Sequence, residues 1–494
     1  DLTDTAAVIK QLDLVITIDT VIAHLAGALG KPVWVMLNFD SDWRWMLDRN
    51  DSPWYPTARL FRQPKIGDWD SVFIEVKQAL IEFMEFQQNL PDLPTSFELA
   101  YQYYQENNLV EAEKICRRIL AEKLEDFQAL NLLAVLENLA GRNDMAIQIL
   151  NQVIILHPNS SQAYSNLGNI LKKECRLEEA ISNYQKAISL EPNDSSNYSN
   201  LGFILFQKDQ IESAIANYEK SLFLEPNNSQ INFNLGHAWQ TKGDLSKAIA
   251  YYQKAINLRP NYALAYRCLG LIFRGQRNLT VSISHYIKAI EIEPNYADAH
   301  FGLAVTLLLN GNLKEGFQEY HWRWQRWEIK KSLSLIQPEK LWDGSNLTGK
   351  TIVLYAEQGY GDTIQFIRYL PLVKQHGGQI ILGCQKPLVR LLEKIPGVEK
   401  ILEEGVNSLS FDVHAPLLEL PRIFGTTLDN IPPPIRNLNI PEVLPIKLEP
   451  PEINSLKVGM VWMTKPSNPT TTKRSCKLRD FQSILDIAGV TFYS

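Results

Sequence analysis

Residues 163–192 read AYSNLGNILKKECRLEEAISNYQKAISLEP, and a closely similar stretch returns at 197–226 as NYSNLGFILFQKDQIESAIANYEKSLFLEP and at 232–260 as NFNLGHAWQTKGDLSKAIAYYQKAINLRP. A proline recurs every 34 residues through this region, at Pro158, Pro192, Pro226, Pro260 and Pro294. Because proline cannot continue a helix and restricts the residue before it, each one marks the end of a helix. The 34-residue period therefore predicts a stack of two-helix units.

Small side chains recur at fixed places inside each unit. Where two helices approach closely, a residue larger than alanine would push them apart. Glycine takes such a place in the first helix and alanine in the second, at Gly168, Gly202, Gly236, Gly270, Ala180, Ala214 and Ala248. The space beside them is expected to be filled by Tyr184, Tyr218, Tyr252 and Tyr286. We interpret all of these as packing residues rather than ligands.

This pattern resembles the tetratricopeptide repeat (TPR), and we count seven units between residues 93 and 327. The resemblance implies a central all-α solenoid that binds a polypeptide or a partner protein. The first unit has Leu124 in place of the proline, and the last has Gly316 in place of the alanine. Divergent units at both ends are expected, because terminal units must cap the stack.

An asparagine precedes the Leu-Gly pair in three successive units, as Asn166, Asn200 and Asn234. The repeats resemble those of the O-linked N-acetylglucosamine transferase, in which the first helices line a concave groove and a ladder of asparagines binds peptide. A column of amides there would hydrogen-bond the backbone of an extended polypeptide. The alternative is a polar helix face or a local helix cap. Cys268 and Gly302 interrupt the column in later units.

Residues 1–90 differ from the repeats and predict a β-α-β unit. Apolar runs at 14–18 and 33–37 suggest two strands, and the helix between them begins near Asp19 and Thr20, either of which can cap it. A strand, a helix and a second strand in this order imply parallel pairing.

The motif Asp-Thr-x-x-Ala-His-Leu-Ala at 19–26 resembles the donor-site signature of the ADP-heptose:lipopolysaccharide heptosyltransferase family (glycosyltransferase family 9-like). Members of that family are two-domain enzymes of GT-B architecture. The resemblance implies that Asp19 and Thr20 hold the donor sugar or its phosphate and that His24 faces the cleft. A helix N-terminus after a strand suits a diphosphate. The alternative is that Asp19 and Thr20 only cap the helix and that His24 is structural.

Residues 345–440 alternate strands with helices, which predicts a doubly wound, Rossmann-like domain. A loop with Gly359, Gly361 and Asp362 follows its first strand, where such sheets bind ligands. The loop matches neither a Walker motif nor G-x-G-x-x-G. It resembles the first loop of the heptosyltransferase family, which implies nucleotide-sugar binding at the glycines and Asp362 as the catalytic base. The alternative is that Asp362 caps the helix.

A linker and the start of a further domain are expected at 441–494. Seven prolines between Pro432 and Pro451 predict an extended connection, and an apolar strand follows at 457–462. The resemblance implies that Lys473 and Arg474 bind the leaving diphosphate, whose negative charge grows as the sugar departs. A solvated basic loop is the alternative.

The order of these parts is inverted relative to a GT-B transferase, in which the Gly-Asp half precedes the Asp-Thr half. One explanation is a piece of a tandem array, with the end of one transferase before the repeats and the start of another after them. The other is a permuted single domain with the solenoid inserted. We favour the array, in which Asp19 and Asp362 belong to different active sites and this chain alone is inactive.

Composition limits the remaining classes. The chain has 494 residues with 55 acidic and 49 basic side chains, a net charge of −6, which disfavours a nucleic-acid binder. Its five cysteines form no C-x-x-C pair, which argues against zinc or a disulfide framework and for a reducing, cytoplasmic setting. No apolar run has the length of a transmembrane helix. No motif for a metal or another cofactor is found.

The fold class predicted from the sequence is therefore mixed, with a central all-α TPR solenoid flanked by α/β Rossmann-like (GT-B) half-domains. We hypothesise a bacterial TPR-containing glycosyltransferase that takes a sugar from a nucleotide-sugar donor, while the solenoid binds an acceptor or partner protein. The alternative is a non-catalytic TPR scaffold for protein–protein interaction whose transferase halves are degenerate or incomplete. The donor sugar and the acceptor cannot be named from the sequence.

Overall fold

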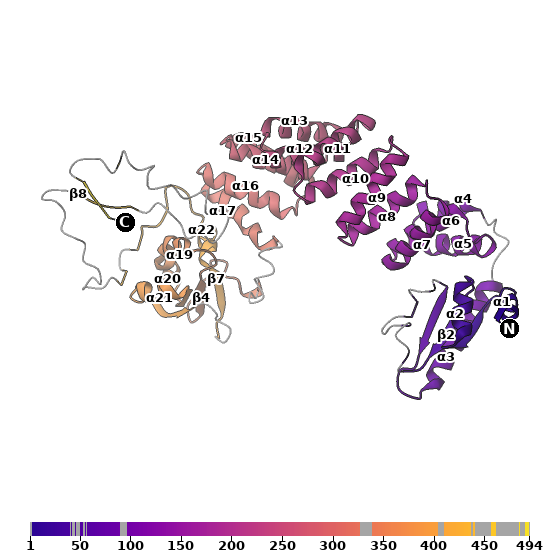
Figure 1. Cartoon of the computed structure of the whole chain (residues 1–494). Coiled ribbons are helices and arrows are strands. Elements are labelled where there is room, and N and C mark those ends of the chain that lie inside the picture. The colour runs from indigo at the N-terminus through magenta and orange to yellow at the C-terminus, as the bar shows by residue number, and fades with distance from the viewer. Residues whose placement is uncertain are drawn as a thin grey trace. The chain divides into compact units, whose positions relative to one another are not determined.

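The computed structural model describes residues 2–39, 41, 45, 50–52, 55, 57–88, 96–326, 338–403, 410–435, 438–439, 456–460, 484 and 490–493. The chain divides into two compact units, called the first and second unit below; they are distinct from the 34-residue repeat units of the solenoid. The first comprises residues 1–310 and 322–326, and the second comprises residues 311–321 and 327–494. Figure 1 labels the elements of both.

Helices follow one another without a strand through residues 97–309, as the repeat predicts (Figure 1). Each helix packs on the helices before and after it in the chain, so the stack is built from sequential contacts. Their bounds are α4 Phe97–Gln105, α5 Leu109–Glu122, α6 Phe127–Leu139, α7 Asn143–Leu156, α8 Ser161–Lys173, α9 Leu177–Leu190, α10 Ser195–Gln207, α11 Ile211–Leu224, α12 Ser229–Lys242, α13 Leu245–Leu258, α14 Ala263–Gly275, α15 Leu279–Ile292 and α16 Ala297–Leu309.

The recurring glycines and tyrosines pack against each other as predicted. Tyr184 and Tyr252 are completely buried in α9 and α13. A Cβ atom added to Gly236 would lie 2.7 Å from Cδ1 of Tyr252, so that ring occupies the space that a larger residue would need. The Tyr184 hydroxyl donates a 2.7 Å hydrogen bond to Oδ1 of Asn169. The tyrosine therefore fixes the first helix of its unit through both its ring and its hydroxyl.

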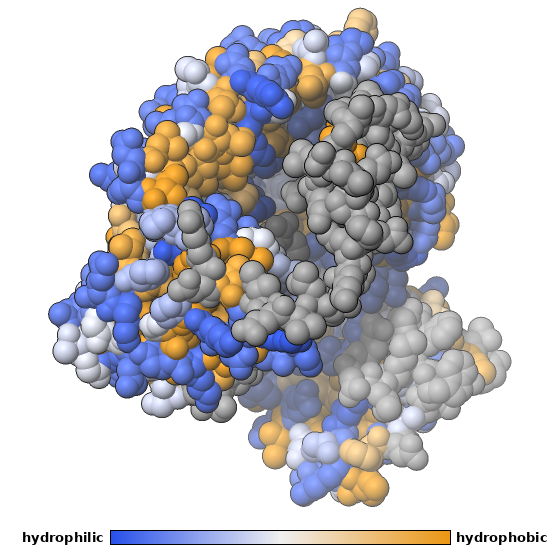
Figure 2. All heavy atoms as spheres, turned by 90° about the vertical axis from the view of Figure 1, so that its left-hand side faces the viewer, coloured by the Kyte–Doolittle hydropathy of each residue, from blue (hydrophilic) through white to orange (hydrophobic). Residues whose placement is uncertain are grey.

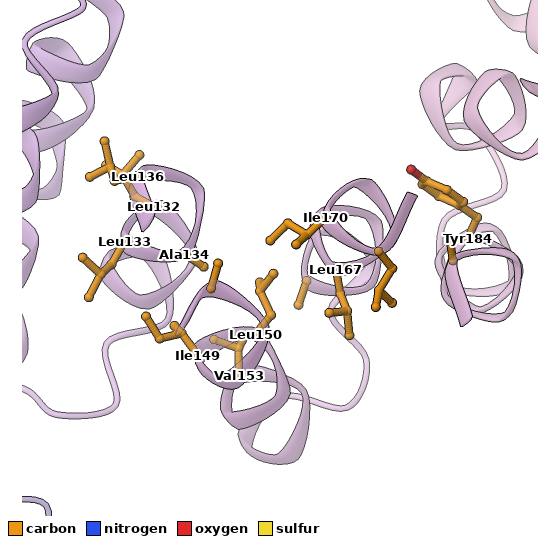
Figure 3. Packing of buried hydrophobic residues seen from close by; sticks show 14 of the residues in the cluster. Leu132, Leu133, Ala134, Leu136, Ile149, Leu150, Val153, Leu167, Ile170 and Tyr184 are labelled. Carbon is orange, nitrogen blue, oxygen red and sulfur yellow. The ribbon is translucent and has the colours of Figure 1, made fainter. Parts of the chain in front are cut away.

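Aliphatic side chains complete the core between successive units. Figure 3 shows side chains of α6, α7 and α8 pointing toward one another, with Leu150 and Leu167 among them. Leu150 is completely buried and Leu167 is 5% exposed. Because every unit adds an equivalent layer, buried clusters follow one another along the solenoid without long-range chain crossings.

A left-handed residue closes most of the first helices. Positive φ angles occur just after α4, α8, α10 and α14, at Asn107, Cys175, Asp209 and Arg277, with values from 58° to 61°. Glycines, Gly141 and Gly243, take the same place after α6 and at the end of α12. At Cys175, the amide of the next residue donates to the Leu171 carbonyl at 2.9 Å, which is the hydrogen bond of a left-handed helix cap.

The α/β part of the first unit contains a three-stranded parallel sheet. Strands β1 Val15–Ile18, β2 Val33–Leu37 and β3 Ala58–Arg62 follow that order, with Val15 opposite Val33 and Val33 opposite Ala58. The expected β-α-β unit is therefore present in its parallel form. Strand β3 and the long helix α3 were not predicted. The helices are α1 Leu2–Ile9, α2 Val21–Ala28 and α3 Trp69–Gln88.

The second unit contains a four-stranded parallel sheet in the order β6-β5-β4-β7. Its strands are β4 Thr351–Tyr355, β5 Gln379–Cys384, β6 Val398–Glu403 and β7 Val413–Pro416. A short 3-10 turn, Ile367–Tyr369, separates α19 from α20, and Pro371 lies in the first turn of α20. The helices are α17 Leu313–Tyr320, which packs on α22, then α19 Tyr360–Phe366, α20 Leu370–Gln375, α21 Lys386–Leu392 and α22 Leu420–Ile423.

Two further strands lie in the segment predicted to begin another domain. They are β8 Leu456–Gly459 and β9 Val490–Tyr493, which pair in parallel. The 3-10 helices of the chain include His321–Gln325, Pro338–Lys340 and Leu417–Glu419.

The surface carries several large apolar side chains. Ile155 is 79% exposed and Phe223 is 76% exposed. On the face seen in Figure 2, hydrophobic residues lie in patches among hydrophilic ones. Within the described part of the chain, none of the helices combines the length and the apolar character needed to span a bilayer.

Candidate functional site

The predicted peptide-binding residues fall on three successive first helices. Asn166 lies on α8, Asn200 on α10 and Asn234 on α12, and each is partly buried. Because they hold the same place in consecutive units, their side chains form a row, which we call the asparagine column. The surface carried by α8, α10, α12 and α14 is called the first-helix face below.

Hydrogen bonds within the solenoid orient two members of the column. Oδ1 of Asn200 accepts from Nζ of Lys172 at 2.7 Å. Oδ1 of Asn234 accepts from Nε2 of Gln230 at 3.0 Å. In both residues Oδ1 accepts one hydrogen bond within the solenoid, whereas among the described residues no acceptor bonds the Nδ2 group. The column consequently presents N–H donors, which suit the carbonyl oxygens of a polypeptide backbone.

Lys172 connects neighbouring units on this face. It belongs to the end of α8, while its partner Asn200 lies on α10, and its Nζ is also 5.8 Å from the ring centroid of Phe203. Burial lowers the pKa of the Lys172 amine. The cost of desolvating this charge is offset only in part by a neutral amide partner, so a further acceptor would be favourable there.

Aromatic side chains adjoin the column further along the stack. The His237 ring lies 4.9 Å from that of Phe206 and 6.3 Å from that of Phe233. The Tyr262 hydroxyl donates to Oε1 of Gln230 at 2.9 Å, so the glutamine that orients Asn234 is itself held by the following unit. These contacts keep the side chains of this face in fixed positions.

The predicted donor residues of the first α/β part lie at the start of α2. Thr20 is the N-cap, and its Oγ1 accepts from the Ile22 amide at 3.3 Å. It also lies 3.1 Å from Oγ1 of Thr17. Asp19 is exposed beside it. The capping function proposed for this pair is thus present at Thr20, and a phosphate at the same place would compete for the same amides.

His24 belongs to an aromatic cluster. Its Nδ1 lies 3.1 Å from the Tyr55 hydroxyl, and its ring stacks on Trp45 with centroids 5.2 Å apart. Tyr55 also covers Gly27, where an added Cβ would lie 2.6 Å from Cδ1 of the ring. These contacts agree with the structural alternative for His24.

The glycine loop of the second unit follows β4, and its aspartate serves as a cap. Gly359 is the N-cap of α19, and its amide donates to Oδ2 of Asp362 at 3.0 Å. Gly361 is exposed, and an added Cβ would meet nothing within 4 Å. Gln385 supports the loop from the next strand, donating to the Gln358 carbonyl at 2.6 Å. Asp362 is partly buried.

The residues predicted to bind the leaving diphosphate cannot be placed. Lys473 and Arg474 lie outside the described residues. In the part of the chain that the structure describes, His, Cys, Asp and Glu side chains form no group of three that would hold a metal ion. Asp19 belongs to the first unit and Asp362 to the second.

Sequence reasoning located the asparagine column but missed the residues that orient it. Lys172 contacts Asn200 across a boundary between repeat units. Gln230 contacts Asn234 one turn further along the same helix. Gln230 could have been found, because it precedes Asn234 by four residues on the same helix. Lys172 could not, because its contact depends on how two units stack.

Comparisons with protein families identify the repeats. Residues 161–194 match a model described as a tetratricopeptide repeat, residues 202–243 and 241–276 match a TPR repeat model, and residues 183–216 and 285–318 match another tetratricopeptide repeat model. The predicted TPR units are therefore confirmed in this part of the solenoid.

Similar proteins include Protein FlbA of Caulobacter vibrioides, which is 39% identical over 83 residues. That match covers 17% of this chain and 14% of the relative, so the chain spans only a small part of the curated relative's length.

Similar solved structures include MamA and YrrB, the second described as a TPR protein with an unusual peptide-binding site. MamA is 25% identical with a TM-score of 0.32, covering 33% of this chain and 94% of its own. YrrB is 22% identical with a TM-score of 0.32, covering 37% and 93%. PilF of Pseudomonas aeruginosa is 20% identical with a TM-score of 0.39, covering 41% and 92%.

Proposed function

We propose that the solenoid is a protein-interaction module that binds a polypeptide in extended conformation along its first-helix face. The observation that carries this proposal is the asparagine column, Asn166, Asn200 and Asn234, in which intramolecular hydrogen bonds occupy Oδ1 of the last two and leave the Nδ2 donors. Donors repeated once per unit recognise the chain of a peptide rather than particular side chains.

The proposal is tested by replacing all three asparagines with alanine in the full chain. Binding partners captured from a peptide array would be measured again with the variant by fluorescence polarisation. We expect affinity to fall about tenfold or more, because each lost hydrogen bond contributes roughly 0.5–1.5 kcal/mol. The melting temperature is measured in parallel, because Asn200 accepts from the partly buried Lys172 amine and its loss should lower stability modestly.

A matched control replaces three asparagines of the second helices, Asn183, Asn217 and Asn257. Asn183 and Asn217 hydrogen-bond the carbonyls of Glu179 and Ser213 on their own helices. This variant has the same composition as the first and should bind peptides normally. Equal loss of binding in both variants, or no loss in the first, would contradict the proposal.

A second candidate function is glycosyl transfer from a nucleotide-sugar, and one observation favours it. The sheet order β6-β5-β4-β7 equals the order 3-2-1-4 with which a doubly wound sheet begins, and the Gly359–Asp362 loop leaves the carboxyl end of its first strand. In this proposal Gly359 and Gly361 lie against the nucleotide-sugar and Asp362 is the base that takes the acceptor proton.

The other residues of this second candidate remain predictions. Asp19, Thr20 and His24 would bind donor in a separate site, and Lys473 and Arg474 would bind the leaving diphosphate. The cap at Thr20 and the Tyr55 contact of His24 give both residues a structural function that needs no ligand.

Thermal shift measurements with ADP- and UDP-sugars test the second candidate. A donor that binds the folded chain raises its melting temperature by linkage. Asp362→Asn keeps an acceptor for the Gly359 amide, so it should preserve the thermal shift and abolish nucleotide release. No shift with any nucleotide-sugar, while peptide binding is retained, would favour the non-catalytic scaffold.

A further inference from the structure

The charged residues within α8, α10, α12 and α14 are all of one sign. The helices of the first-helix face contain no aspartate or glutamate, although the chain as a whole is acidic. Their ionic residues are all basic: Lys172, Lys173, Lys242, Arg267 and Arg274. The second helices of the same units carry both signs, with the acidic residues Glu178, Glu179, Glu212, Glu219 and Glu291 and the basic residues Lys186, Lys220, Lys247, Lys254 and Lys288. This face is therefore a positive strip on a negative protein.

Most of these cations have no carboxylate within ion-pair distance among the described residues. Lys242 forms an ion pair with Glu212 at 3.1 Å. Through the described part of the chain, no carboxylate lies within ion-pair distance of the other four, Lys172, Lys173, Arg267 and Arg274. Lys173 instead donates to Oδ1 of Asn138 at 3.3 Å. By contrast, Arg176 and Lys288 are each paired with a glutamate on a second helix, at 2.7 and 2.9 Å.

Arg267 is the most constrained of the unpaired cations. It is partly buried in α14, its Nε is buried without an acceptor, and one Nη lies 3.9 Å from Sγ of Cys268 in a weak contact. Asp298 on the next first helix is paired with Nε of Arg326 at 2.8 Å and also attracts the Arg267 guanidinium from beyond ion-pair distance. A guanidinium without its full set of acceptors is costly in a partly desolvated place, and a carboxylate can bind it in a bidentate geometry.

Arg267 also continues the asparagine column. The column ends where Cys268 replaces asparagine in the sixth unit, and Arg267 is the residue immediately before that place. From Asn200 to Arg267 this surface therefore offers hydrogen-bond donors in three consecutive units. A ligand that supplies only acceptors, namely backbone carbonyls and carboxylates, matches such a surface.

We infer that the first-helix face binds an acidic polypeptide segment, whose backbone contacts the asparagine column and one of whose carboxylates binds Arg267. This inference rests on the proposed peptide-binding function and specifies the partner. Lys172 adds to the attraction at the other end of the strip, while Arg267 fixes the register because it is the basic residue of this face that has a buried N–H group without an acceptor.

The test uses the full chain and three N-acetylated peptides. One alternates glutamate and alanine with an amidated C-terminus, the second replaces glutamate with glutamine, and the third is the glutamine peptide with a free C-terminal carboxylate. We expect the glutamate peptide to bind at least tenfold more tightly than the amidated glutamine peptide, with an affinity that falls as salt increases. Tight binding of the third peptide would identify the terminal carboxylate as the group that Arg267 holds.

Two substitutions separate a specific contact from general attraction. Arg267→Gln should lower affinity for the glutamate peptide about tenfold or more and leave the glutamine peptide unchanged. Arg267→Lys retains the charge but not the bidentate geometry. Its affinity for the glutamate peptide should lie between those of the unmodified chain and Arg267→Gln. Lys254→Gln removes one charge from the exposed part of α13 and serves as the matched control, with no change expected. Melting temperatures verify that each variant is folded.

The outcomes distinguish this inference from the proposed function. Equal binding of the glutamate and glutamine peptides, or equal losses from Arg267→Gln and Lys254→Gln, would overturn the acidic partner. If the glutamine peptide then still binds and the triple asparagine variant weakens it, the proposed function stands. If the glutamate peptide binds through Arg267 but is indifferent to the asparagines, backbone recognition by the column is wrong while the acidic partner is supported.

Discussion

In the repeats, the stabilising contacts join residues that are close in the sequence. In the parallel sheets, they join residues that are far apart in the sequence. In the solenoid, Tyr252 covers Gly236 of its own unit, and each helix packs mainly on the helices beside it in the chain. In the sheet of the second unit, by contrast, Ile352 of β4 lies opposite Val413 of β7. Local contacts repeat and leave a period in the sequence, whereas distant strand pairs leave none. The comparison also teaches that a defect in the solenoid should be confined to neighbouring units.

The largest expected effect comes from Tyr252→Ala. The side chain is completely buried, and its hydroxyl donates to Oε1 of Gln240 at 2.7 Å. We expect a loss of about 3–5 kcal/mol in the stability of the surrounding units, because the substitution leaves a cavity and an unpaired amide. Hydrogen exchange should show faster exchange in α12 to α14 and unchanged protection in β4 and β5. Equal loss of protection in that sheet would break the comparison.

Gly302→Ala tests how tightly the tyrosines fill the space between helices. An added Cβ would overlap the ring of Tyr286, so the substitution should destabilise the chain by about 1–3 kcal/mol. Gly275→Ala is the matched control, because nothing lies within 4 Å of its Cβ position at the end of α14. That change should be neutral or slightly stabilising. Similar denaturant midpoints for the two variants would show that the rings can move aside.

Glu137→Gln tests the contact between the first pair of units. Glu137 is 1% exposed and accepts from Arg117 at 2.6 Å and from Arg142. Removing its charge should cost about 2 kcal/mol, since charge-assisted hydrogen bonds contribute more than neutral ones.

The exposed pair Glu179 and Arg176 is the reference for that measurement. Glu179→Gln should leave stability almost unchanged, because solvent screens the pair. Urea denaturation of both variants sharpens the comparison, since a large effect at Glu137 alone would place the stability of the stack at unit boundaries. Equal small effects would assign it to packing instead.

The smallest effects are expected at the left-handed turns. Arg277 and Cys175 adopt φ angles of 61° and 58°, which strain a residue with a Cβ atom. Arg277→Gly and Cys175→Gly should therefore stabilise their units by up to about 1 kcal/mol. Gly243→Ala, at a φ of 94°, should do the reverse. Calorimetric melting temperatures would contradict this account if all three changes moved in the same direction.

Most of the helical fold could be predicted from the sequence, and the sheets only in part. The 34-residue period revealed the helix pairs, apolar runs revealed β1 and β2, and the alternation of strands with helices revealed β4, β5, β6 and β7. Strand β3 was missed because its sequence, Ala58–Arg62, contains two arginines and is stabilised by its neighbour β2 rather than by its own pattern. Helix α17 was counted with the repeats, and the structure places it in the second unit, packed on α22.

The candidate site shows the same division. Asn166, Asn200 and Asn234 were visible because they repeat, and the caps at Thr20 and Asp362 were visible because capping is local. The contact of Lys172 with Asn200 and the burial of the Arg267 Nε group without an acceptor both depend on how the repeat units stack. Neither could be predicted from the sequence. The Tyr55 contact of His24 joins residues 31 positions apart and left no signal in the sequence.

The left-handed turn described after the first helices has one more consequence. Because Asn107, Cys175, Asp209 and Arg277 reproduce nearly one backbone geometry with unrelated side chains, the joint between paired helices does not depend on any particular amino acid. Gene duplication or deletion of a whole 34-residue module would therefore preserve every joint. The length of such a scaffold can change during evolution in discrete steps, independently of the sheets encoded at either side.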